Sequence, residues 1–197
     1  MIKERCPTEC PYRTRYEASF SINTPTNPRA MFISHRGDER VIQPCLFNNP
    51  HLQALGETDS GRALAFLLDY CKLTMDDVYL TNVLKCLLPQ DIEPEEQAYR
   101  ACISHLEREI QQLNPRAIVI FGREAFDSIF EYMGQRLHYH GQSPMPRLNF
   151  NARLLRAEIR LDNIPTLVMN HYCRIHRIKK DQEAQVLKDF LVRAGVI

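Results

Sequence analysis

The stretch "VYLTNVLKC", residues 78–86, begins as a buried β-strand and ends in polar side chains. Its near-continuous apolar start is typical of a strand that is covered on both faces of a sheet. An Asn, a Lys and a Cys then follow where the strand should end. Ligands of α/β proteins bind beyond the carboxyl ends of the strands, so Asn82 stands where a ligand-reading group is expected.

Strands and helices alternate on either side of this stretch. Short apolar runs predict further strands at residues 29–34, 117–122, 157–161 and 166–169. Spaced apolar residues predict helices between them, the first with Ser60 as its N-cap and the last over residues 181–193. Such alternation predicts a mostly parallel sheet with helices on both faces. We therefore expect an α/β protein with a single three-layer αβα domain over residues 1–197, of which residues 1–28 form an arm.

Composition narrows the class of protein further. Hydrophobic residues make up 44% and charged residues 25% of the 197 residues, which is typical of a soluble globular protein. No apolar run is long enough to cross a bilayer, and the first ten residues contain no apolar signal stretch. We therefore expect a cytoplasmic protein without a membrane segment.

The net charge of +1 conceals a basic segment. Residues 134–180 contain nine Lys or Arg and two acidic residues. A basic segment on a nearly neutral protein is expected either at a phosphate-binding face or in a solvated loop, and charge alone favours neither.

Seven cysteines are unusual for a reducing compartment and raise the question of metal ligation. Cys6 and Cys10 form a C-x3-C pair, and Cys86 and Cys102 lie sixteen residues apart. Together they supply the four ligands that a [4Fe–4S] cluster or a structural zinc ion requires. Taken singly, Cys102 fits the apolar stripe of a helix better as a small core residue than as a ligand. For the four cysteines together, spacing alone favours neither a metal site nor its absence.

A longer block carries a resemblance to a known family. The segment "DVYLTNVLKCLLPQDIEPEEQAYRACISHLEREIQQLNPRAIVIFG", residues 77–122, resembles the central block of the family four uracil-DNA glycosylases. That family has a strand ending in Thr-Asn-Val-x-Lys-Cys, a Pro-rich loop, a second cysteine on the next helix and a Pro-led strand ending in Gly. The resemblance extends from Gly61 to Phe130 and, more thinly, to the carboxyl-terminal His loop. It implies a uracil-DNA-glycosylase-like fold.

The resemblance also assigns roles to the cysteines. In the family, two amino-terminal and two central cysteines hold a [4Fe–4S] cluster with a structural role, which implies Cys6, Cys10, Cys86 and Cys102 as its ligands here. The amino-terminal pair of the family is normally C-x2-C rather than C-x3-C. This departure leaves zinc as the less favoured occupant of the same four cysteines.

Two polar residues match the family's active site. The position of Asn82 implies that it reads the Watson–Crick edge of a flipped base, for which an amide offers a donor and an acceptor side by side. The simpler reading is an Asn that caps the following turn. The position of His171 implies a donor to O2 of the departing pyrimidine, although Tyr172 stands where the family has a proline.

The segment "CRIHRIKK", residues 173–180, is expected to face DNA. Its cations would contact phosphates and its first isoleucine would fill the gap left by the flipped base. The residues expected to contact DNA are Arg174, Ile175, Arg177, Lys179 and Lys180.

The first active-site motif departs from the family pattern. The family begins its site with Gly-Glu-Ala-Pro-Gly, where this chain has "SHRGDER" from Ser34 to Arg40. His35 occupies roughly the family's Glu position, and we expect it to line the base pocket with Ser34 and Gly37. Either Asp38 or Glu39 is expected to direct the attacking water.

The sequence has no Phe at the place where the family's ring stacks on uracil. A small, closed pocket depends on such a ring, so a bulkier modified pyrimidine is a second possible substrate beside uracil.

These features predict a monomeric DNA glycosylase that acts on DNA with a flipped base. The first alternative is a catalytically inactive, glycosylase-like DNA-binding protein, which loss of the Gly-Glu-Ala-Pro-Gly motif favours. The second is a nucleotide-binding or small-molecule-binding α/β protein, which is disfavoured because no phosphate-cradling Gly-rich loop follows any predicted strand.

Overall fold

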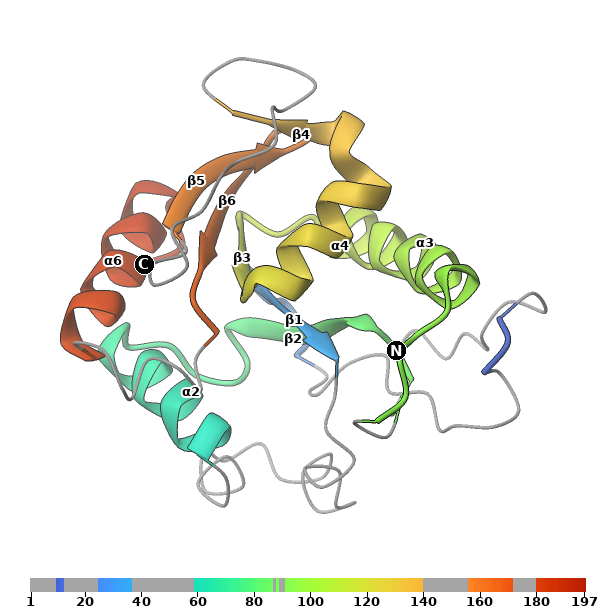
Figure 1. Cartoon of the computed structure of the whole chain (residues 1–197). Coiled ribbons are helices and arrows are strands. Elements are labelled where there is room, and N and C mark those ends of the chain that lie inside the picture. Colours follow the sequence, from blue (N-terminus) through green and yellow to red (C-terminus); the bar gives the residue numbers. More distant parts are fainter. Residues whose placement is uncertain are drawn as a thin grey trace.

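A central β-sheet with helices on both faces forms the body of the protein (Figure 1). The computed structural model describes residues 10–12, 25–36, 59–86, 88, 91–139, 156–171 and 180–197. The elements in chain order are β1 (Ala30–Arg36), α2 (Asp59–Tyr70), β2 (Val78–Leu84), α3 (Glu96–Leu113), β3 (Ala117–Phe121), α4 (Arg123–Met133), η3 (Gly134–Arg136), β4 (Leu137–His138), β5 (Arg156–Leu161), β6 (Ile164–Met169) and α6 (Lys180–Arg193).

The strand order in the sheet is β2-β1-β3-β6-β5-β4. Strand β1 pairs in parallel with β2 and β3, and β3 pairs in parallel with β6. At the other edge β5 runs antiparallel to both β4 and β6. The prediction of a mostly parallel sheet in a three-layer α/β fold is therefore confirmed. The antiparallel hairpin of β5 and β6 arises because only a tight turn at Asp162 and Asn163 separates them, which leaves no room for a crossover helix.

Alternate side chains of the strands pack on opposite faces of the sheet, as the pleat requires. Phe32 of β1 and Leu80 of β2 belong to the core beneath α2 and α6, which we call the α2/α6 face. Ile33 and Val83 belong to the core beneath α3 and α4, the α3/α4 face. Closely packed apolar side chains dominate both cores, so the sheet is a rigid platform for the residues at its strand ends.

The helices follow the apolar spacing of the sequence. In α2, Leu64, Leu67 and Leu68 are buried on one side. The helix begins at Asp59, so Ser60 lies within its first turn, and the prediction of Ser60 as the N-cap is wrong. Of the helices that the structure describes, α3 is the longest, and it ends at Leu113. Its C-cap is Asn114, whose left-handed backbone (φ 41°) lets its N–H bond to the carbonyl of Ile110. Within the described ranges, no helix is both long and apolar enough to span a membrane.

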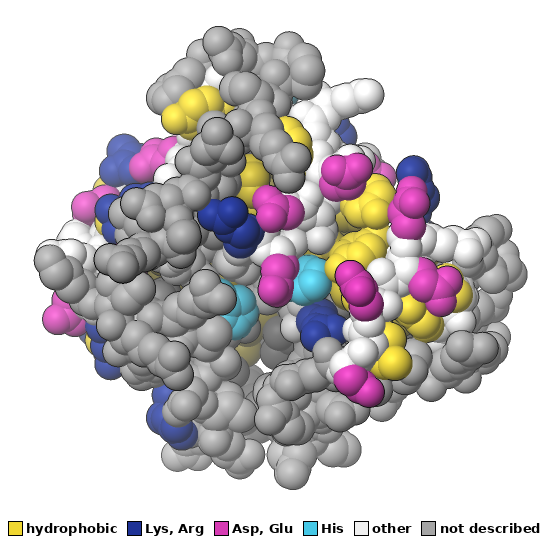
Figure 2. Space-filling view, in the orientation of Figure 1, with side chains coloured by type: hydrophobic (Ala, Val, Ile, Leu, Met, Phe, Trp, Pro, Cys, Tyr) yellow, Lys and Arg dark blue, Asp and Glu magenta, His cyan; other side chains and the backbone are white. Residues whose placement is uncertain are grey.

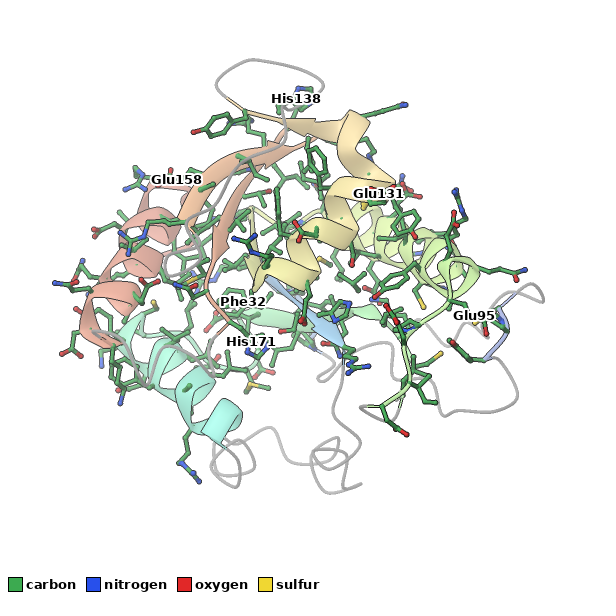
Figure 3. The ribbon with its side chains drawn as sticks, in the orientation of Figure 1. Phe32, Glu95, Glu131, His138, Glu158 and His171 are labelled. Carbon is green, nitrogen blue, oxygen red and sulfur yellow. The ribbon has the colours of Figure 1, made fainter. Side chains whose placement is uncertain are left out.

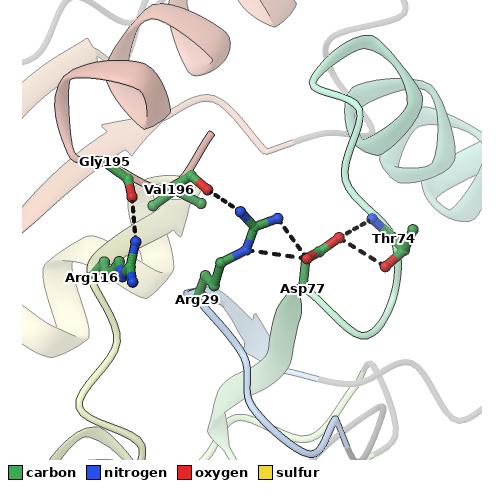
Figure 4. A network of polar contacts seen from close by, with 6 residues as sticks. All are labelled: Arg29, Thr74, Asp77, Arg116, Gly195 and Val196. Atoms are coloured by element: carbon green, nitrogen blue, oxygen red, sulfur yellow. Dashed lines mark hydrogen bonds and ion pairs between the residues drawn. The ribbon is translucent and has the colours of Figure 1, made fainter.

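Two arginines form hydrogen bonds at the amino-terminal ends of the parallel strands (Figure 4). The guanidinium of Arg29 donates to Asp77 Oδ1 from Nε (3.2 Å) and Nη2 (2.6 Å), and from Nη1 to the carbonyl of Val196 (2.5 Å). Arg116 donates to the carbonyl of Gly195 at 2.9 Å. These bonds join the starts of β1, β2 and β3 to the carboxyl-terminal residues of the chain. They lie at the end of the strands opposite to the polar strand ends.

Candidate active site

Side chains from four strands meet in one row at the carboxyl end of the sheet. Ser34 of β1 is the direct partner of Asn82 in β2. The register of β1 with β3 brings Phe121 level with Ser34, and Phe121 in turn pairs with Met169 of β6. We call Asn82, Ser34, Phe121 and Met169 the strand-end row.

All four side chains of the strand-end row lie on the α2/α6 face. Phe121 and Met169 belong to the core on that face. Ser34 and Asn82 each lie two residues after a member of the same core, so strand alternation puts them on the same side. Asn82 is only 3% and Ser34 only 6% exposed. The row therefore presents an amide and a hydroxyl in a largely dry setting, where hydrogen bonds discriminate strongly.

His171 stands at the same edge, two residues beyond the end of β6 (Figure 3). It packs against Gly122, the residue after β3, whose N–H donates to the carbonyl of Met169 at 2.8 Å. A Cβ on Gly122 would lie 3.3 Å from Cβ and 3.6 Å from Cδ2 of His171. The structure thus brings His171 and Asn82 to one end of the sheet, and Gly122 leaves space for the imidazole.

Sequence reasoning missed both Gly122 and Phe121 as contributors to this site. Phe121 lies in the strand-end row and packs edge-on against Phe32, with ring centroids 5.3 Å apart and an interplanar angle of 68°. The signal was present in "AIVIFG", where the glycine ends a strand of a parallel sheet. That stretch, however, also matches an ordinary buried strand, and only the register shows which neighbours its last two residues meet.

His35 faces the opposite side of the sheet from Ser34. Its Nε2 lies 2.9 Å from the hydroxyl of Tyr99 in α3, and its Nδ1 lies 3.5 Å from Oε2 of Glu124 in α4. The His35 and Tyr99 rings are stacked at 6.0 Å, and Tyr99 stacks in turn on Tyr132 at 5.8 Å. Burial lowers the pKa of His35, although Glu124 acts in the other direction, so the neutral imidazole is favoured at pH 7. Ser34 and His35 were both expected to line the base pocket. In the structure, Ser34 lies beside Asn82, whereas His35 contacts Tyr99 on the other side of the sheet.

The surface around these strand ends is not uniformly basic. In the face shown in Figure 2, histidine side chains come to the surface near the centre, with acidic, hydrophobic and Lys or Arg side chains around them. Lys180, the first residue of α6, places its Nζ 3.8 Å above the ring of Phe66 in α2. This cation–π contact keeps a positive charge at the α2–α6 seam.

Three of the four cysteines of interest are described, and all are buried. Cys10 and Cys86 lie in one small apolar cluster with Tyr12 and Ala98. Cys102 lies nearby on α3, where its Sγ accepts the backbone N–H of Lys85 at 3.4 Å. In the same region the Tyr12 hydroxyl accepts the N–H of Glu95 at 3.2 Å, just before α3.

Residues 10–12, the residues that follow β2 and helix α3 thus lie together around these cysteines. Among the residues that the structure describes, no three His, Cys, Asp or Glu side chains are grouped closely enough to hold a metal ion. Several other predicted site residues lie outside the described part of the chain, namely Cys6, Gly37, Asp38, Glu39, Arg174, Ile175, Arg177 and Lys179.

Known proteins with similar sequences identify the family of this chain. Residues 22–190 match the family model of the Uracil DNA glycosylase superfamily. A Type-4 uracil-DNA glycosylase of Saccharolobus solfataricus is 31% identical over 84 residues, which are 42% of this chain and 39% of the relative. Another, from Sulfurisphaera tokodaii, is 41% identical over 63 residues (32% and 29%), and one from Archaeoglobus fulgidus is 37% identical over 71 residues (36% and 36%).

The matched segments cover less than half of each of these relatives. The family model, in contrast, extends over most of the chain, from before β1 into α6. The α/β architecture with polar residues at its strand ends agrees with that match. This chain therefore belongs to the uracil-DNA glycosylase superfamily.

Proposed function

We propose that this protein is a monomeric, single-domain DNA glycosylase that hydrolyses the N-glycosidic bond of a flipped uracil or modified pyrimidine base. The observation that carries the proposal is that Asn82 and His171 both lie at the carboxyl end of the same sheet. Asn82 lies there in register with Ser34, and His171 lies against Gly122. Membership of the superfamily supports the reaction type, and the Type-4 relatives support uracil as the default base.

Base recognition falls to Asn82. Its amide would donate to O4 and accept from N3–H of a pyrimidine that has left the DNA stack. Because Asn82 is almost fully buried, a base that mismatches its donor and acceptor would leave a dry polar group unsatisfied, which is a large penalty. Ser34 stands beside it in the row, and the Phe121 ring lies one strand further on.

Bond cleavage falls to His171 and one carboxylate. The bond between C1′ and the base nitrogen breaks with its electron pair moving to the base, and the sugar develops oxocarbenium character. The imidazole of His171 donates to O2 of the base as negative charge gathers there. A water directed by Asp38 or Glu39 then adds to C1′ and gives its proton to that carboxylate. The departed base anion takes up a proton from solvent, and the carboxylate returns its own, which yields the free base and an abasic sugar.

We further propose that Cys6, Cys10, Cys86 and Cys102 hold a [4Fe–4S] cluster. The buried thiols of the three described cysteines suit it, and a backbone N–H already points at Sγ of Cys102, as a thiolate requires. When bound, the cluster would serve as a structural link between the arm and the loop after β2. Zinc in the same four cysteines is the alternative, and metal analysis separates the two.

One experiment tests the function. End-labelled oligonucleotides with uracil or a modified pyrimidine are incubated with the protein and then treated with alkali, which breaks the strand at abasic sites. Breaks at the modified position, lost in Asp38→Asn or Glu39→Gln, support the proposal and identify the water-directing carboxylate. Intact strands with retained binding would instead show a glycosylase-like protein that binds DNA without cutting it.

A further inference from the structure

A buried ion pair joins β2 to α3 just beneath the proposed base pocket. The Lys85 ammonium donates to Oε2 of Glu109 and to Oγ1 of Thr81, both at 2.6 Å. The Thr81 hydroxyl closes the ring by donating to the same Oε2 at 3.0 Å. The Lys85 side chain is 0% and the Glu109 side chain 2% exposed, so the pair lies in the protein interior.

This ion pair is adjacent in sequence to the proposed base-reading residue and to a proposed cluster ligand. Thr81 directly precedes Asn82, and Lys85 directly precedes Cys86. The backbone N–H of Lys85 donates to Sγ of Cys102, which lies two helical turns before Glu109 on the same side of α3. One helix face therefore holds the end of β2 at both Thr81 and Lys85, on either side of Asn82.

Stability alone does not account for such a pair. Removing two charges from water costs more than an isolated ion pair regains unless every polar atom is satisfied, and apolar replacements of similar volume are often neutral or stabilising. Within the described part of the chain, Oε1 of Glu109 has no hydrogen-bond partner. A buried ion pair is known in other proteins to add specificity to packing, because only one register between two elements pairs its charges.

We infer that Lys85 and Glu109 are positioning residues that fix Asn82 against the cysteine-bearing helix α3, so that its amide meets only the matching base edge. This inference rests on the proposed function. Strand alternation supports the geometry, because the odd residues Thr81 and Lys85 face α3 while Asn82 faces the pocket on the other side of the sheet. The pair thus holds β2 from the α3/α4 face, on the side of the sheet opposite to the base.

The test is the double variant Lys85→Met with Glu109→Leu, compared with Lys85→Met alone. The single variant leaves a buried carboxylate unpaired and should melt at a lower temperature than the wild type, whereas the double variant should recover most of that loss. The stable double variant is then compared with the wild type for release of uracil against cytosine from matched oligonucleotides. Its release of uracil should slow on the order of a hundredfold, the loss that a displacement of about 1 Å can cause, and its preference for uracil over cytosine should fall.

Two readouts that do not depend on activity accompany this assay. Amide hydrogen exchange should become at least about tenfold faster at residues 81–86 of the double variant, with β3 unchanged. Iron content should stay at the wild-type level, because the cysteines and the Lys85 backbone N–H remain. Loss of iron together with selectivity would overturn the inference, since cluster loss would then explain the change.

The remaining outcomes are equally decisive. Unchanged exchange at residues 81–86, or faster exchange with the uracil preference intact, overturns the positioning role. Asp77→Asn is the control. It weakens the hydrogen bonds of Asp77 with Arg29 and Thr74 at the amino-terminal ends of the strands, so it should lower stability without altering base preference. If the wild type releases no base from any oligonucleotide, the proposed function fails, and the exchange readout still decides whether the pair fixes the strand.

Discussion

His171 lies against the backbone of Gly122, with its Cβ only 3.3 Å from the point where a side chain on that glycine would begin. Gly122 also has a φ of +94°, which L-residues with side chains rarely adopt. The glycine thus does two things at once: it turns the chain from β3 into α4, and it leaves room for the imidazole. The contact joins two residues that are 49 positions apart in the sequence.

Substitution Gly122→Ala should therefore damage both stability and chemistry. The strained backbone should cost about 1–3 kcal/mol of unfolding free energy. The new methyl group should displace His171 and slow base release. The matched control is Gly134→Ala, since a Cβ there meets nothing within 4 Å and the backbone is right-handed helical. Equal losses in the two variants, measured by thermal melting and single-turnover cleavage, would contradict this role of Gly122.

Substitutions of His171 and Asn82 should have different effects on catalysis and base selectivity. His171→Ala removes a donor that is needed mainly in the transition state, so base release should slow on the order of a hundredfold or more while DNA binding persists. Asn82→Ala should slow release as well and should also blur discrimination between pyrimidines. Single-turnover rates on uracil, cytosine and thymine oligonucleotides check both. Wild-type behaviour of both variants would place the active site elsewhere.

The cysteine ligands should be visible in the purified protein. We expect a brown protein with broad visible absorbance, and Cys102→Ser should bleach it and destabilise the fold. Cys71→Ala is the control, because Cys71 packs in the core beneath α2, and burial raises the pKa of its thiol to about 11. A colourless protein with one bound zinc ion would exclude iron–sulfur and retain the four ligands.

Stability should fall in acid through Asp162. Hydrogen bonds from Arg136 hold the pKa of Asp162 below its usual value, although partial burial acts against them. A carboxyl whose pKa is lowered by folding stabilises the protein above its unfolded pKa, near 4, and loses this contribution as pH falls through the lower folded value. Asp162→Asn should therefore flatten the decline in melting temperature below about pH 4. An unchanged acid limb would show that the Arg136 bonds contribute nothing.

Residues 173–180, at the end of the basic segment, should bind DNA through its phosphate charges and not through its base sequence. Replacing Arg174 and Arg177 with Ala should weaken binding to all oligonucleotides alike and reduce the salt slope by about one unit for each lost phosphate contact. Fluorescence anisotropy at several salt concentrations measures both quantities. Unchanged affinity and slope would show that residues 173–180 form a solvated loop.

The apolar patterns of the sequence were enough to predict the layers of this fold. The runs at residues 78–84 and 117–121 had to be doubly covered strands, and the spacing of Leu64, Leu67 and Leu68 had to be a helix face, because these periodicities are local properties of the chain. The two-residue strand β4 escaped prediction, since so short a segment has no period and pairs only because β5 is beside it.

The contacts that build the site were decided by tertiary structure. Nothing local to Ser34 indicates that it will stand beside Asn82, or that Lys85 will be neutralised by Glu109 of the next helix. Each of these pairs depends on strand register and helix placement, which the packing of both cores sets together. The sequence by itself determined which residue types reach the strand ends, and only the packed sheet decided which of them meet.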